Sequence, residues 1–316
     1  MAEILCGGIA GGLAIKYAMS EIMLGRLEVA LCYAADKEAS IRWFKKFAVG
    51  HPSPQFDPVA MQLYGGPGVV WAYAMATRRY MHQTGAREEH FAMATVRDRH
   101  NARHNPLAAF TEPLTVAEVM ASPVLCSPIK RLDASTSLDG GAAVVVASED
   151  FARRRGLTPV YVTGCGEYHD NSCYIPTDGV DKPIDRFVAV RGAAERAYRD
   201  AGITPAEIDV AELYAPFSPF ELIIAEEMGF FERGGMIKAL ENGETGIGGR
   251  LPINTDGGLL SRGHPWTATP LYETITIVRQ LRGEAGESQV AGARTGLIQC
   301  EGGMLNNAMV IIFSRD

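Results

Sequence analysis

The chain has 316 residues and a formal net charge of −7, from 30 Lys and Arg against 37 Asp and Glu. Its composition, 47% apolar and 21% charged, is that of a globular protein with a large buried core, which excludes a disordered or fibrous chain. The mild acidity provides no broad basic surface, so we expect no nucleic-acid partner. No run reaches the roughly 18 apolar residues of a membrane span, so we expect no membrane association.

The cysteines and the N-terminal residues indicate a cytoplasmic protein. The opening residues, MAEILCGGIAGG, lack the charged segment and cleavage site of a secretory signal. A chain of this size needs no disulfides, and its cysteines are spread widely, so we interpret them as reduced thiols. They are Cys6, Cys32, Cys126, Cys165, Cys173 and Cys300.

The first residues predict a strand, a helix and a second strand. Ile4–Cys6 is short and apolar and is followed by two glycines. Residues 9–24 carry apolar side chains at helical spacing, and Gly25 is expected to end that helix. The continuous apolar run at 29–33 is typical of a buried parallel strand.

Residues 38–125 have the character of a long excursion from the core. They contain the turn-rich clusters HPSPQFDP (51–58) and YGGPG (64–68) and two predicted helices, 69–84 and 87–103. Their aromatic and Met side chains could line a bulky-substrate pocket, form a subunit interface or belong to ordinary core. These are Trp43, Phe44, Phe47, Tyr64, Trp71 and Met81. A buried strand is expected within 132–148.

In the second half, strands and helices alternate, which is typical of an α/β fold. We expect strands at 158–164, 208–214, 294–300 and 307–313, and helices at 186–201, 219–230 and 266–282.

An internal echo indicates a duplication. The segment DGGAAVVVAS (139–148) resembles MLNNAMVIIFS (304–314), and the preceding helices and strands match in order. We therefore expect two duplicated halves, 1–157 and 158–316. In this scheme the first half lacks partners for residues 158–212, as though about 80 residues were missing from its start. The alternative is a chance likeness between two aliphatic strands.

Candidate catalytic residues lie in two loops. LPINTDGGLLSRGHPWTATP (251–270) presents His264 at the start of a helix. LIQCEGGMLNNA (297–308) places Cys300 at the end of a strand, followed by Gly302 and Gly303, whose N–H groups could form an oxyanion site.

These motifs, N-x-x-G-G-x-x-x-x-G-H-P followed by C-x-G-G, resemble the C-terminal half of the thiolase superfamily. RQLRGEAGESQV (279–290) and IDVAELYAPFSPFELIIAEEMGF (208–230) resemble its sterol-carrier-protein-type branch. The resemblance implies a five-layered α-β-α-β-α fold of two duplicated halves, the first without its N-terminal elements. It also implies a homodimer, an acyl-CoA substrate, no covalently bound cofactor, and an OB-fold and zinc-ribbon partner completing a heterotetramer.

The chain departs from thiolases at the nucleophile. A thiolase opens its catalytic helix with C-x-S-G, where the helix N-terminus lowers the pKa of the thiol. Aligned without gaps, that position falls on Gly8, and Cys6 lies two residues earlier. A slip of two residues would instead make Cys6 the nucleophile.

A second departure lies at Tyr214, where thiolases have an Asn or the His of an HDCF motif. A phenol can act as acid or base toward a hydroxyl. Both changes resemble the steroid side-chain aldolases often described as lipid-transfer proteins, which cleave β-hydroxyacyl-CoA thioesters. The chain differs from these in keeping His264 where they have a second tyrosine.

The resemblance assigns the roles for a retro-aldol reaction. Tyr214 would be the base, His264 would donate to the thioester oxygen, and Cys300 would carry the proton of the α-carbon. Gly8, Asn254, Gly302 and Gly303 would form the oxyanion and substrate-binding wall. The alternatives are a thiolase-type acyltransferase using Cys6 or Cys300, and a non-catalytic acyl-CoA-binding subunit. Each of the three side chains could also be a packing residue.

Two other patterns are weak. Cys165-x3-His169-x3-Cys173 fits no familiar four-ligand zinc site, so we expect no metal. The glycine turn at 7–12 before a strand and Asp36 resembles a dinucleotide-binding unit, but Cys6 stands where its first glycine belongs.

Overall fold

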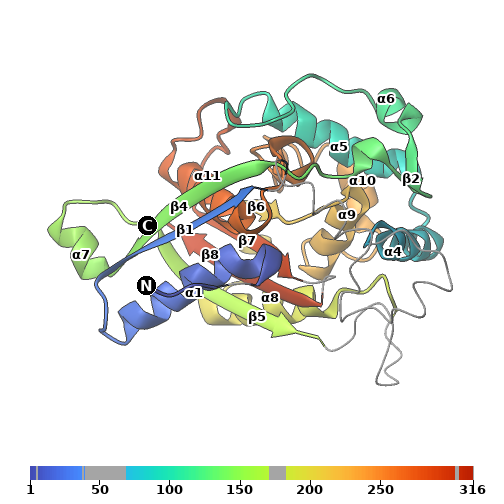
Figure 1. Ribbon diagram of the computed structural model, residues 1–316. Coiled ribbons are helices and arrows are strands. Elements are labelled where there is room, and N and C mark those ends of the chain that lie inside the picture. Colours follow the sequence, from blue (N-terminus) through green and yellow to red (C-terminus); the bar gives the residue numbers. More distant parts are fainter. Residues whose placement is uncertain (5, 38, 40–68, 171–182, 303–305, 316) are drawn as a thin grey trace.

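The computed structural model describes residues 1–4, 6–37, 39, 69–170, 183–302 and 306–315 (Figure 1). Within these ranges, no helix is both long and apolar enough to cross a membrane. Most predicted elements are present, with their boundaries moved by up to five residues.

The core is a four-stranded sheet in the order β5-β8-β7-β6. Its strands are β5 (Tyr161–His169), β6 (Val210–Leu213), β7 (Thr295–Gly302) and β8 (Asn307–Ser314). Strands β6 and β7 run parallel, and the other two pairs are antiparallel. Nearly every residue of β6, β7 and β8 is buried, because helices cover both faces.

Helix α8 (Val188–Ala201) covers the outer face of this sheet against β5 and β8. The approach is close at Gly166, where an added Cβ would lie 1.9 Å from the carbonyl oxygen of Ala193. Helices α1 (Ala10–Met23) and α11 (Thr269–Arg282) lie on the opposite face and contact one another. Beyond them lies a two-stranded antiparallel sheet of β1 (Val29–Lys37) and β4 (Asp139–Ala147) (Figure 1).

The described elements therefore follow the expected order of layers from α8 to the β1–β4 sheet. The two halves also correspond: α1, β1 and β4 repeat the arrangement of α11, β7 and β8, in which a helix packs on an antiparallel pair. Among the described residues, the first half holds no counterpart of β5, α8 or β6.

The expectation of a buried parallel strand at 29–33 was wrong. Strand β1 pairs antiparallel with β4, and its side chains alternate between covered and exposed. A continuous apolar run suggests a strand covered on both faces, but here no described element covers the outer face. The strand predicted in 132–148 is β4, and it is likewise half-exposed rather than buried.

The described residues of the predicted strand at 4–6 are not in a strand. Leu5 lies outside the described residues, and Ile4 and Cys6 have no strand partners. Cys6 instead precedes a 3-10 turn, η1 (Gly7–Ile9), because Gly7 takes a positive φ of 55° and the chain turns directly into α1. At the other end of α1, Gly25 has a φ of 69°, as expected of a glycine after a helix.

Residues 69–125 hold α4 (Val69–Thr84), α5 (Glu88–Ala102) and α6 (Val116–Ala121), followed by the short hairpin β2 (Val124–Cys126) and β3 (Ile129–Lys130). The two helices predicted here are confirmed, whereas both turn-rich clusters lie outside the described residues. Helix α5 packs against α9 (Ser218–Glu227) and α10 (Gly235–Glu241). Helix α7 (Glu149–Arg154) follows β4.

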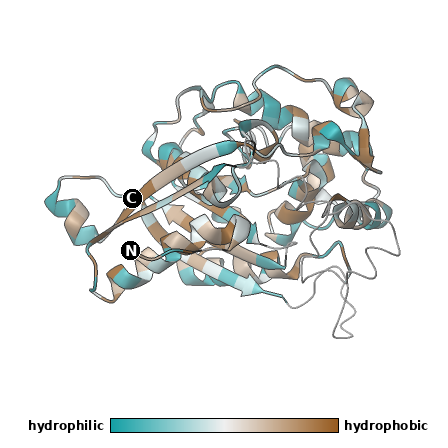
Figure 2. Ribbon diagram, in the orientation of Figure 1, coloured by the Kyte–Doolittle hydropathy of each residue, from teal (hydrophilic) through white to brown (hydrophobic). Residues whose placement is uncertain are grey.

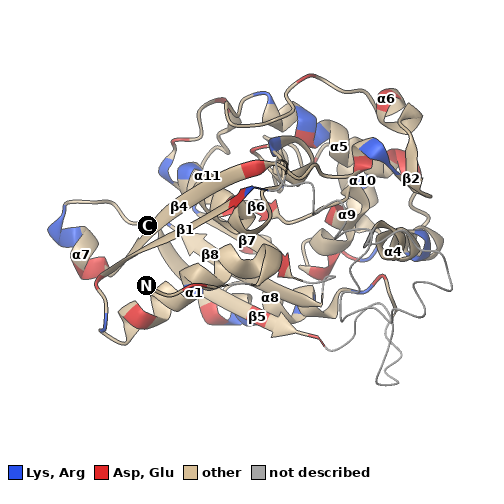
Figure 3. Cartoon of the chain, in the orientation of Figure 1, with Lys and Arg blue, Asp and Glu red and all other residues tan. Residues whose placement is uncertain are grey.

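Charge and hydropathy vary along the β1–β4 sheet. Figure 3 shows the β1–β4 sheet tan over most of its length, because its charged residues (Asp36, Lys37 and Asp139) all lie at one end. Figure 2 shows β4 becoming strongly hydrophobic toward its C-terminal end.

Candidate active site

Tyr214 directly follows β6 and is held firmly by its backbone. Its N–H donates to the carbonyl oxygen of Gln299 at 3.0 Å and lies 3.1 Å from Gln299 Oε1. Only 2% of Tyr214 is exposed, so the ring is enclosed by protein. The end of a parallel strand thus fixes the position of the phenol.

His264 lies against this phenol. Tyr214 Oη is 2.5 Å from His264 Nε2, and the two rings meet edge to face, with centroids 5.1 Å apart. On the other side of the imidazole, Ser135 Oγ lies 3.4 Å from Nδ1. The three side chains form a chain of groups able to pass a proton, Tyr214 to His264 to Ser135.

The His264 loop is pinned by its backbone. His264 N–H donates to the carbonyl of Thr136, and its own carbonyl accepts from Leu138 N–H. Gly263 before it has a φ of 112°, and an added Cβ there would lie 2.3 Å from a methyl group of Leu138. Only glycine fits this position, which explains the glycine of the G-H-P motif.

Gly8 faces the Tyr214 ring from the start of α1. A Cβ at this position would lie 2.3 Å from Tyr214 Oη, 2.6 Å from its Cζ and 2.7 Å from the carbonyl oxygen of Glu301. The hydroxyl of Tyr214 therefore occupies the space that a side chain at position 8 would need.

Cys300 lies within β7, two residues before its end at Gly302, rather than at the end of a strand as predicted. Its thiol is fully buried; Sγ lies 3.7 Å from the carbonyl oxygen of Met309, and a Cβ at Gly12 would lie 2.9 Å from Sγ. Burial, first, and then the carboxyl of Glu273 raise the pKa of Cys300 well above its usual value, so the thiol keeps its proton.

Asn254 is 1% exposed, and both polar atoms of its side chain are engaged. Its Oδ1 accepts from Leu213 N–H at 2.8 Å, and its Nδ2 donates to Glu221 at 2.9 Å. Arg97 pairs with the same Glu221 carboxylate. In this structure Asn254 holds the residue before Tyr214, rather than presenting its amide to a pocket.

This chain is similar to several known proteins. Residues 181–315 match the family model described as thiolase C-terminal domain-like. The acetyl-CoA acetyltransferase of Methanothermobacter thermautotrophicus is 35% identical over 97% of this chain and 78% of its own length. The chain belongs to the thiolase superfamily.

Within the superfamily, the chain is also similar to carbon–carbon lyases. The 17-hydroxy-3-oxo-4-pregnene-20-carboxyl-CoA lyase of Mycobacterium tuberculosis is 29% identical over 98% of this chain and 80% of its own length. The solved Ltp2-ChsH2(DUF35) aldolase superposes with a TM-score of 0.86 at 28% identity, over 98% of this chain and 78% of that one. The thiolase-like fold and the resemblance to acyl-CoA aldolases are thereby confirmed.

Electrostatics keep the Tyr214–His264 pair of this thiolase-superfamily chain neutral. Burial, and then Arg262, lower the pKa of His264 to about 3. Burial, and then the carboxyls of Glu301 and Glu273, raise the pKa of Tyr214 well above its usual value. At neutral pH the phenol therefore keeps its proton and the imidazole is uncharged, so the hydroxyl donates to Nε2.

The alignment with thiolases predicts that their nucleophile position falls on Gly8; Cys6 lies just before η1. Burial, and then Glu167, raise the pKa of the Cys6 thiol, which is opposite to the activation that a nucleophile needs. Gly302, at the end of β7, lies beside this turn, since a Cβ there would be 3.6 Å from the Cys6 carbonyl oxygen. Gly303 lies outside the described residues.

Two buried carboxyls near the pair were missed from the sequence. Glu301, next to Cys300, is 4% exposed and accepts from Tyr73 Oη at 3.2 Å. Glu273 on α11 is 1% exposed, and within the described part of the chain neither of its oxygens has a hydrogen-bond partner. Burial raises the pKa of both carboxyls well above the usual value. Glu273 lay in no motif, whereas Glu301 lay inside the C-x-G-G motif, where its position beside Cys300 was a usable signal.

The weak cofactor patterns gain no support. Across the described residues, no group of three His, Cys, Asp or Glu side chains could hold a metal ion; Cys173 of the Cys-His-Cys pattern lies outside them. Asp36 of the supposed dinucleotide unit instead accepts from Thr267 Oγ1 and from Ala268 N–H at 3.1 Å, which ties β1 to the start of α11.

Proposed function

We propose that this chain, an acyl-CoA enzyme of the thiolase superfamily, catalyses retro-aldol cleavage of a β-hydroxyacyl-CoA thioester. The observation that carries the proposal is the 2.5 Å contact between Tyr214 Oη and His264 Nε2, in a site where Gly8 leaves no side chain for acyl transfer. The phenol takes the space of a nucleophile and is paired with an imidazole able to receive its proton.

In the proposed reaction, Tyr214 Oη accepts the proton of the substrate β-hydroxyl as its own proton passes to His264 Nε2. The bond between the α- and β-carbons then breaks, and its electron pair forms the thioester enolate. The α-carbon takes up one proton, which leaves a ketone or aldehyde and a shorter acyl-CoA. One proton leaves the hydroxyl and one joins the α-carbon, so no oxidant or other co-reactant is needed.

Burial explains why this pair can work although, before substrate binds, Tyr214 holds its proton tightly and His264 resists protonation. In a dry site, an imidazolium alone is unfavourable, which lowers the pKa of His264. Negative charge that develops on the substrate in the same site stabilises that imidazolium far more strongly than water would allow. The positive charge on His264 therefore forms together with the enolate. Ser135 Oγ accepts from Nδ1–H and keeps Nε2 free to receive the proton.

Cys300 is the proposed donor to the α-carbon. Because its pKa is raised, the thiol is suited to deliver a proton and poorly suited to attack a carbonyl. In this proposal the proton held by the Tyr214–His264 pair restores the thiol after each turnover. Gly302 and Gly303 remain proposed as oxyanion donors.

A thiolase-type acyltransferase is the second candidate, favoured by the similarity to the Methanothermobacter acetyl-CoA acetyltransferase. It requires an acylated thiol, and the two candidates are Cys6 and Cys300. The raised pKa of both thiols and the glycine at position 8 argue against it.

The substrate and partners of relatives guide the test. The substrate in the name of the mycobacterial lyase bears a hydroxyl at carbon 17, β to the thioester. The solved Ltp2-ChsH2(DUF35) aldolase supports the proposal of a partner chain. We propose a bulky β-hydroxyacyl-CoA of this kind as substrate, and assembly as a homodimer with such a partner.

The experiment compares wild type, Tyr214→Phe and Tyr198→Phe with 17-hydroxy-3-oxo-4-pregnene-20-carboxyl-CoA, with and without a DUF35 partner. Tyr198 is a matched control, since its buried hydroxyl donates to the Met228 carbonyl far from the pair. Loss of a positioned base typically costs about 10²- to 10⁴-fold in kcat, which is expected for Tyr214→Phe alone. Unchanged cleavage in that variant contradicts the mechanism. An acyl adduct on Cys6 or Cys300 in the mass spectrum establishes the transferase, and no turnover with either partner state indicates a binding subunit.

A further inference from the structure

A buried ion pair joins helix α5 to helix α9. Arg97 of α5 pairs with Glu221 of α9; the Arg97 side chain is 10% exposed, and that of Glu221 is fully buried. Arg97 Nη1 also donates to Thr245 Oγ1 at 3.1 Å. Removing two such charges from water costs free energy that their attraction often only offsets, so a buried pair can commonly be replaced by apolar side chains without loss of stability. Stability alone therefore gives little reason for this pair.

The neighbouring carboxyl of Asp98 does not balance the charge of Arg97. Burial raises the pKa of Asp98 well above its usual value, so this carboxyl keeps its proton at neutral pH. Its Oδ1 lies 2.5 Å from Arg97 Nη2, and within the described residues its Oδ2 has no hydrogen-bond partner. Glu221 is therefore the carboxylate that balances Arg97, and removing Arg97 and Glu221 together leaves no lone charge in this part of the core.

Glu221 connects this ion pair to the residue before Tyr214. Its Oε2, the oxygen that pairs with Arg97, also accepts from Asn254 Nδ2 at 2.9 Å. Because Nδ2 is a donor and faces the carboxylate, the acceptor Oδ1 is turned the other way, toward the backbone of β6. There it accepts from the N–H of Leu213 at 2.8 Å. The carboxylate thus sets the orientation of the amide that holds the end of β6.

Helix α5 also holds the loop that carries His264. Asn101, one turn after Arg97, is 1% exposed. Its Nδ2 donates to the carbonyl oxygens of Ile253 and Asn254 at 3.3 and 3.0 Å. Two successive turns of α5 therefore bind Asn254, one through Glu221 to the side chain and the other directly to the backbone.

The chain that follows α5 holds the other end of the same loop. The N–H groups of Ala109 and Phe110 donate to the carbonyl oxygens of Arg262 and Ser261, at 3.1 and 3.0 Å. The loop is thereby bound from Asn254 to within two residues of His264. Part of the excursion expected from the sequence thus supports this loop rather than lining a pocket.

We propose that Glu221, held by Arg97, is a positioning residue for the Tyr214–His264 pair and acts through Asn254. The amide of Asn254 holds the backbone directly before Tyr214, and the backbone of Asn254 begins the loop that carries His264. The orientation of this side chain therefore sets the distance between the two rings. A displacement of about 1 Å can cost about 10²-fold in rate. The effect on catalysis rests on the proposed lyase activity, whereas the contact between the rings is a property of the chain itself.

Two double variants separate the hydrogen bond from the charge. Arg97→Met with Glu221→Gln removes both charges but keeps an oxygen that can accept from Asn254 Nδ2. Arg97→Met with Glu221→Met removes the charges and the acceptor together. Since neither variant leaves a lone buried charge, both are expected to fold, which urea unfolding checks.

The measurements are kcat and KM with the β-hydroxyacyl-CoA named above, and the NMR chemical shift of His264 Nε2, assigned with His264→Gln. Arg97→Met/Glu221→Gln is expected to match wild type in all three. Arg97→Met/Glu221→Met is expected to show about 10²-fold lower kcat at unchanged KM. Its Nε2 resonance is expected to move, because the nitrogen no longer accepts from Tyr214. A side chain that only stabilised the fold would move neither kcat nor this resonance.

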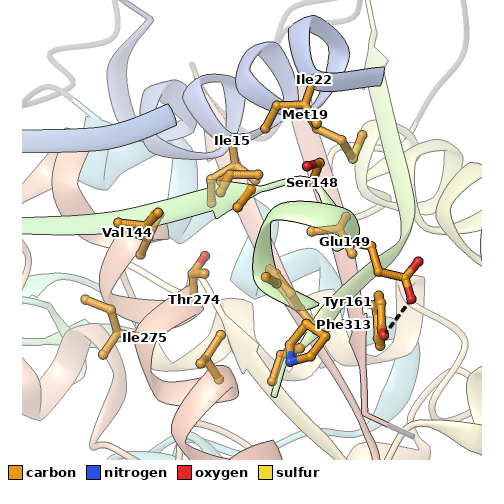
Figure 4. Close-up of a pocket in the computed structure, with 18 of the residues that line it drawn as sticks. Ile15, Met19, Ile22, Val144, Ser148, Glu149, Tyr161, Thr274, Ile275 and Phe313 are labelled. Atoms are coloured by element: carbon orange, nitrogen blue, oxygen red, sulfur yellow. Dashed lines mark hydrogen bonds between the residues drawn. The ribbon is translucent and has the colours of Figure 1, made fainter. Parts of the chain in front are cut away.

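Two control variants lower stability outside this network. Glu226→Met removes another buried carboxyl group of α9, which accepts from Tyr80 Oη at 2.7 Å. Phe313→Ala removes a buried ring from the wall of a cavity of about 710 Å³ beside β4, none of whose described lining residues belongs to the network (Figure 4). Both are expected to lower the urea midpoint and to leave kcat and the Nε2 shift as in wild type.

Wild-type kcat and Nε2 shift in Arg97→Met/Glu221→Met overturn the proposal, and so does an equal loss in both double variants. If Arg97→Met/Glu221→Met does not fold, Asn254→Gly removes the same amide without burying a charge. It is expected to move the Nε2 shift, and an unchanged shift there also contradicts the positioning role. If wild type cleaves no β-hydroxyacyl-CoA, the proposed function fails, and the Nε2 shift alone decides whether Glu221 positions the pair.

Discussion

Gly8 and Tyr214 exclude larger groups from each other's position. A Cβ at Gly8 would lie 2.3 Å from the hydroxyl oxygen of Tyr214, a separation that nonbonded atoms do not adopt. A side chain at position 8 and a tyrosine at position 214 therefore cannot coexist without movement of α1 or β6. A thiol at position 8 and a phenol at position 214 therefore compete for the same space.

This exclusion predicts that Gly8→Cys alone damages the protein. Overpacking a filled site typically costs about 1–3 kcal/mol, and here it also pushes the phenol away from His264. We expect a lower unfolding midpoint in urea together with loss of the proposed lyase activity. A variant as stable and as active as wild type would show that the site is not crowded.

Gly8→Cys combined with Tyr214→Asn is expected to behave differently. The shorter amide removes the clash with the phenol, although the 2.7 Å approach to the Glu301 carbonyl oxygen stays. A thiol in η1, just before α1, gains the pKa-lowering field of the helix N-terminus. We expect stability to recover relative to Gly8→Cys and an acyl adduct at position 8 after incubation with acetyl-CoA, detected by peptide mass spectrometry. Tyr214→Asn alone, the matched control, is expected to show no adduct.

The low pKa of His264 predicts an unusual pH dependence. Since this pKa is about 3 in the folded chain, His264 does not titrate between about pH 5 and pH 8, and kcat/KM is expected to show no histidine limb there. In the unfolded chain, His264 takes up a proton near pH 6.5, whereas in the folded chain it stays neutral until about pH 3. The free energy of unfolding therefore falls as the pH drops through this window.

His264→Gln is expected to make that fall shallower, as measured by urea unfolding at a series of pH values. His82→Gln removes an exposed histidine at the end of α4 and is the matched control, with an unchanged slope. A His264→Gln slope equal to that of wild type would show that the pKa of His264 is not lowered in the folded chain.

Helices and strands could be predicted where the spacing of apolar residues in the sequence reflects which side chains are buried. Helices α4, α5 and α8 and the strands of the four-stranded sheet lie within a few residues of the predicted ranges. The β1 strand was misread because an apolar run looks the same whether its outer face is covered or exposed. The Ile4–Cys6 strand failed because Gly7 turns the chain into α1, and three residues hold too little pattern to reveal this.

Individual residues of the candidate site could be predicted from the sequence, but their arrangement could not. Motifs located Tyr214, His264 and Cys300, but the 2.5 Å contact between the first two joins positions 50 residues apart and depends on the fold. Ser135 and Glu273 had no signal, since an isolated polar residue in a sequence reveals nothing of its burial. Asn254 was predicted to touch substrate, whereas the structure engages it with Leu213 and Glu221.

Asn254 is therefore expected to affect stability strongly. It has a positive φ of 52°, and its amide satisfies two buried groups. Asn254→Ala adds backbone strain to the loss of both bonds, for an expected total of about 2–4 kcal/mol. Asn254→Gly also loses both hydrogen bonds but adds no backbone strain. Its free energy of unfolding, measured in urea, should therefore be higher than that of Asn254→Ala. The exposed Asn242→Ala is expected to change stability by less than about 0.5 kcal/mol.

Substitution of Glu273 by Gln is expected to stabilise the protein. Its buried carboxyl has no hydrogen-bond partner among the described residues, and burial raises its pKa well above the unfolded value. The folded chain therefore holds a proton that the unfolded chain releases, and stability falls as the pH rises from about 4.5 through the folded pKa. Glu273→Gln removes this fall, so the variant should be more stable than wild type at pH 8 by more than the ~0.5 kcal/mol of a neutral surface change.

The advantage should shrink toward zero as the pH is lowered below about 4.5, where Glu273 becomes protonated in both states. Since the Glu273 charge also raises the pKa of Tyr214, the alkaline limb of the lyase activity should move to lower pH in the variant. Glu284→Gln removes an exposed carboxyl just beyond α11 and should alter neither property. Equal stability of wild type and Glu273→Gln at pH 8 would mean that the carboxyl is ionised and has found a partner in solution.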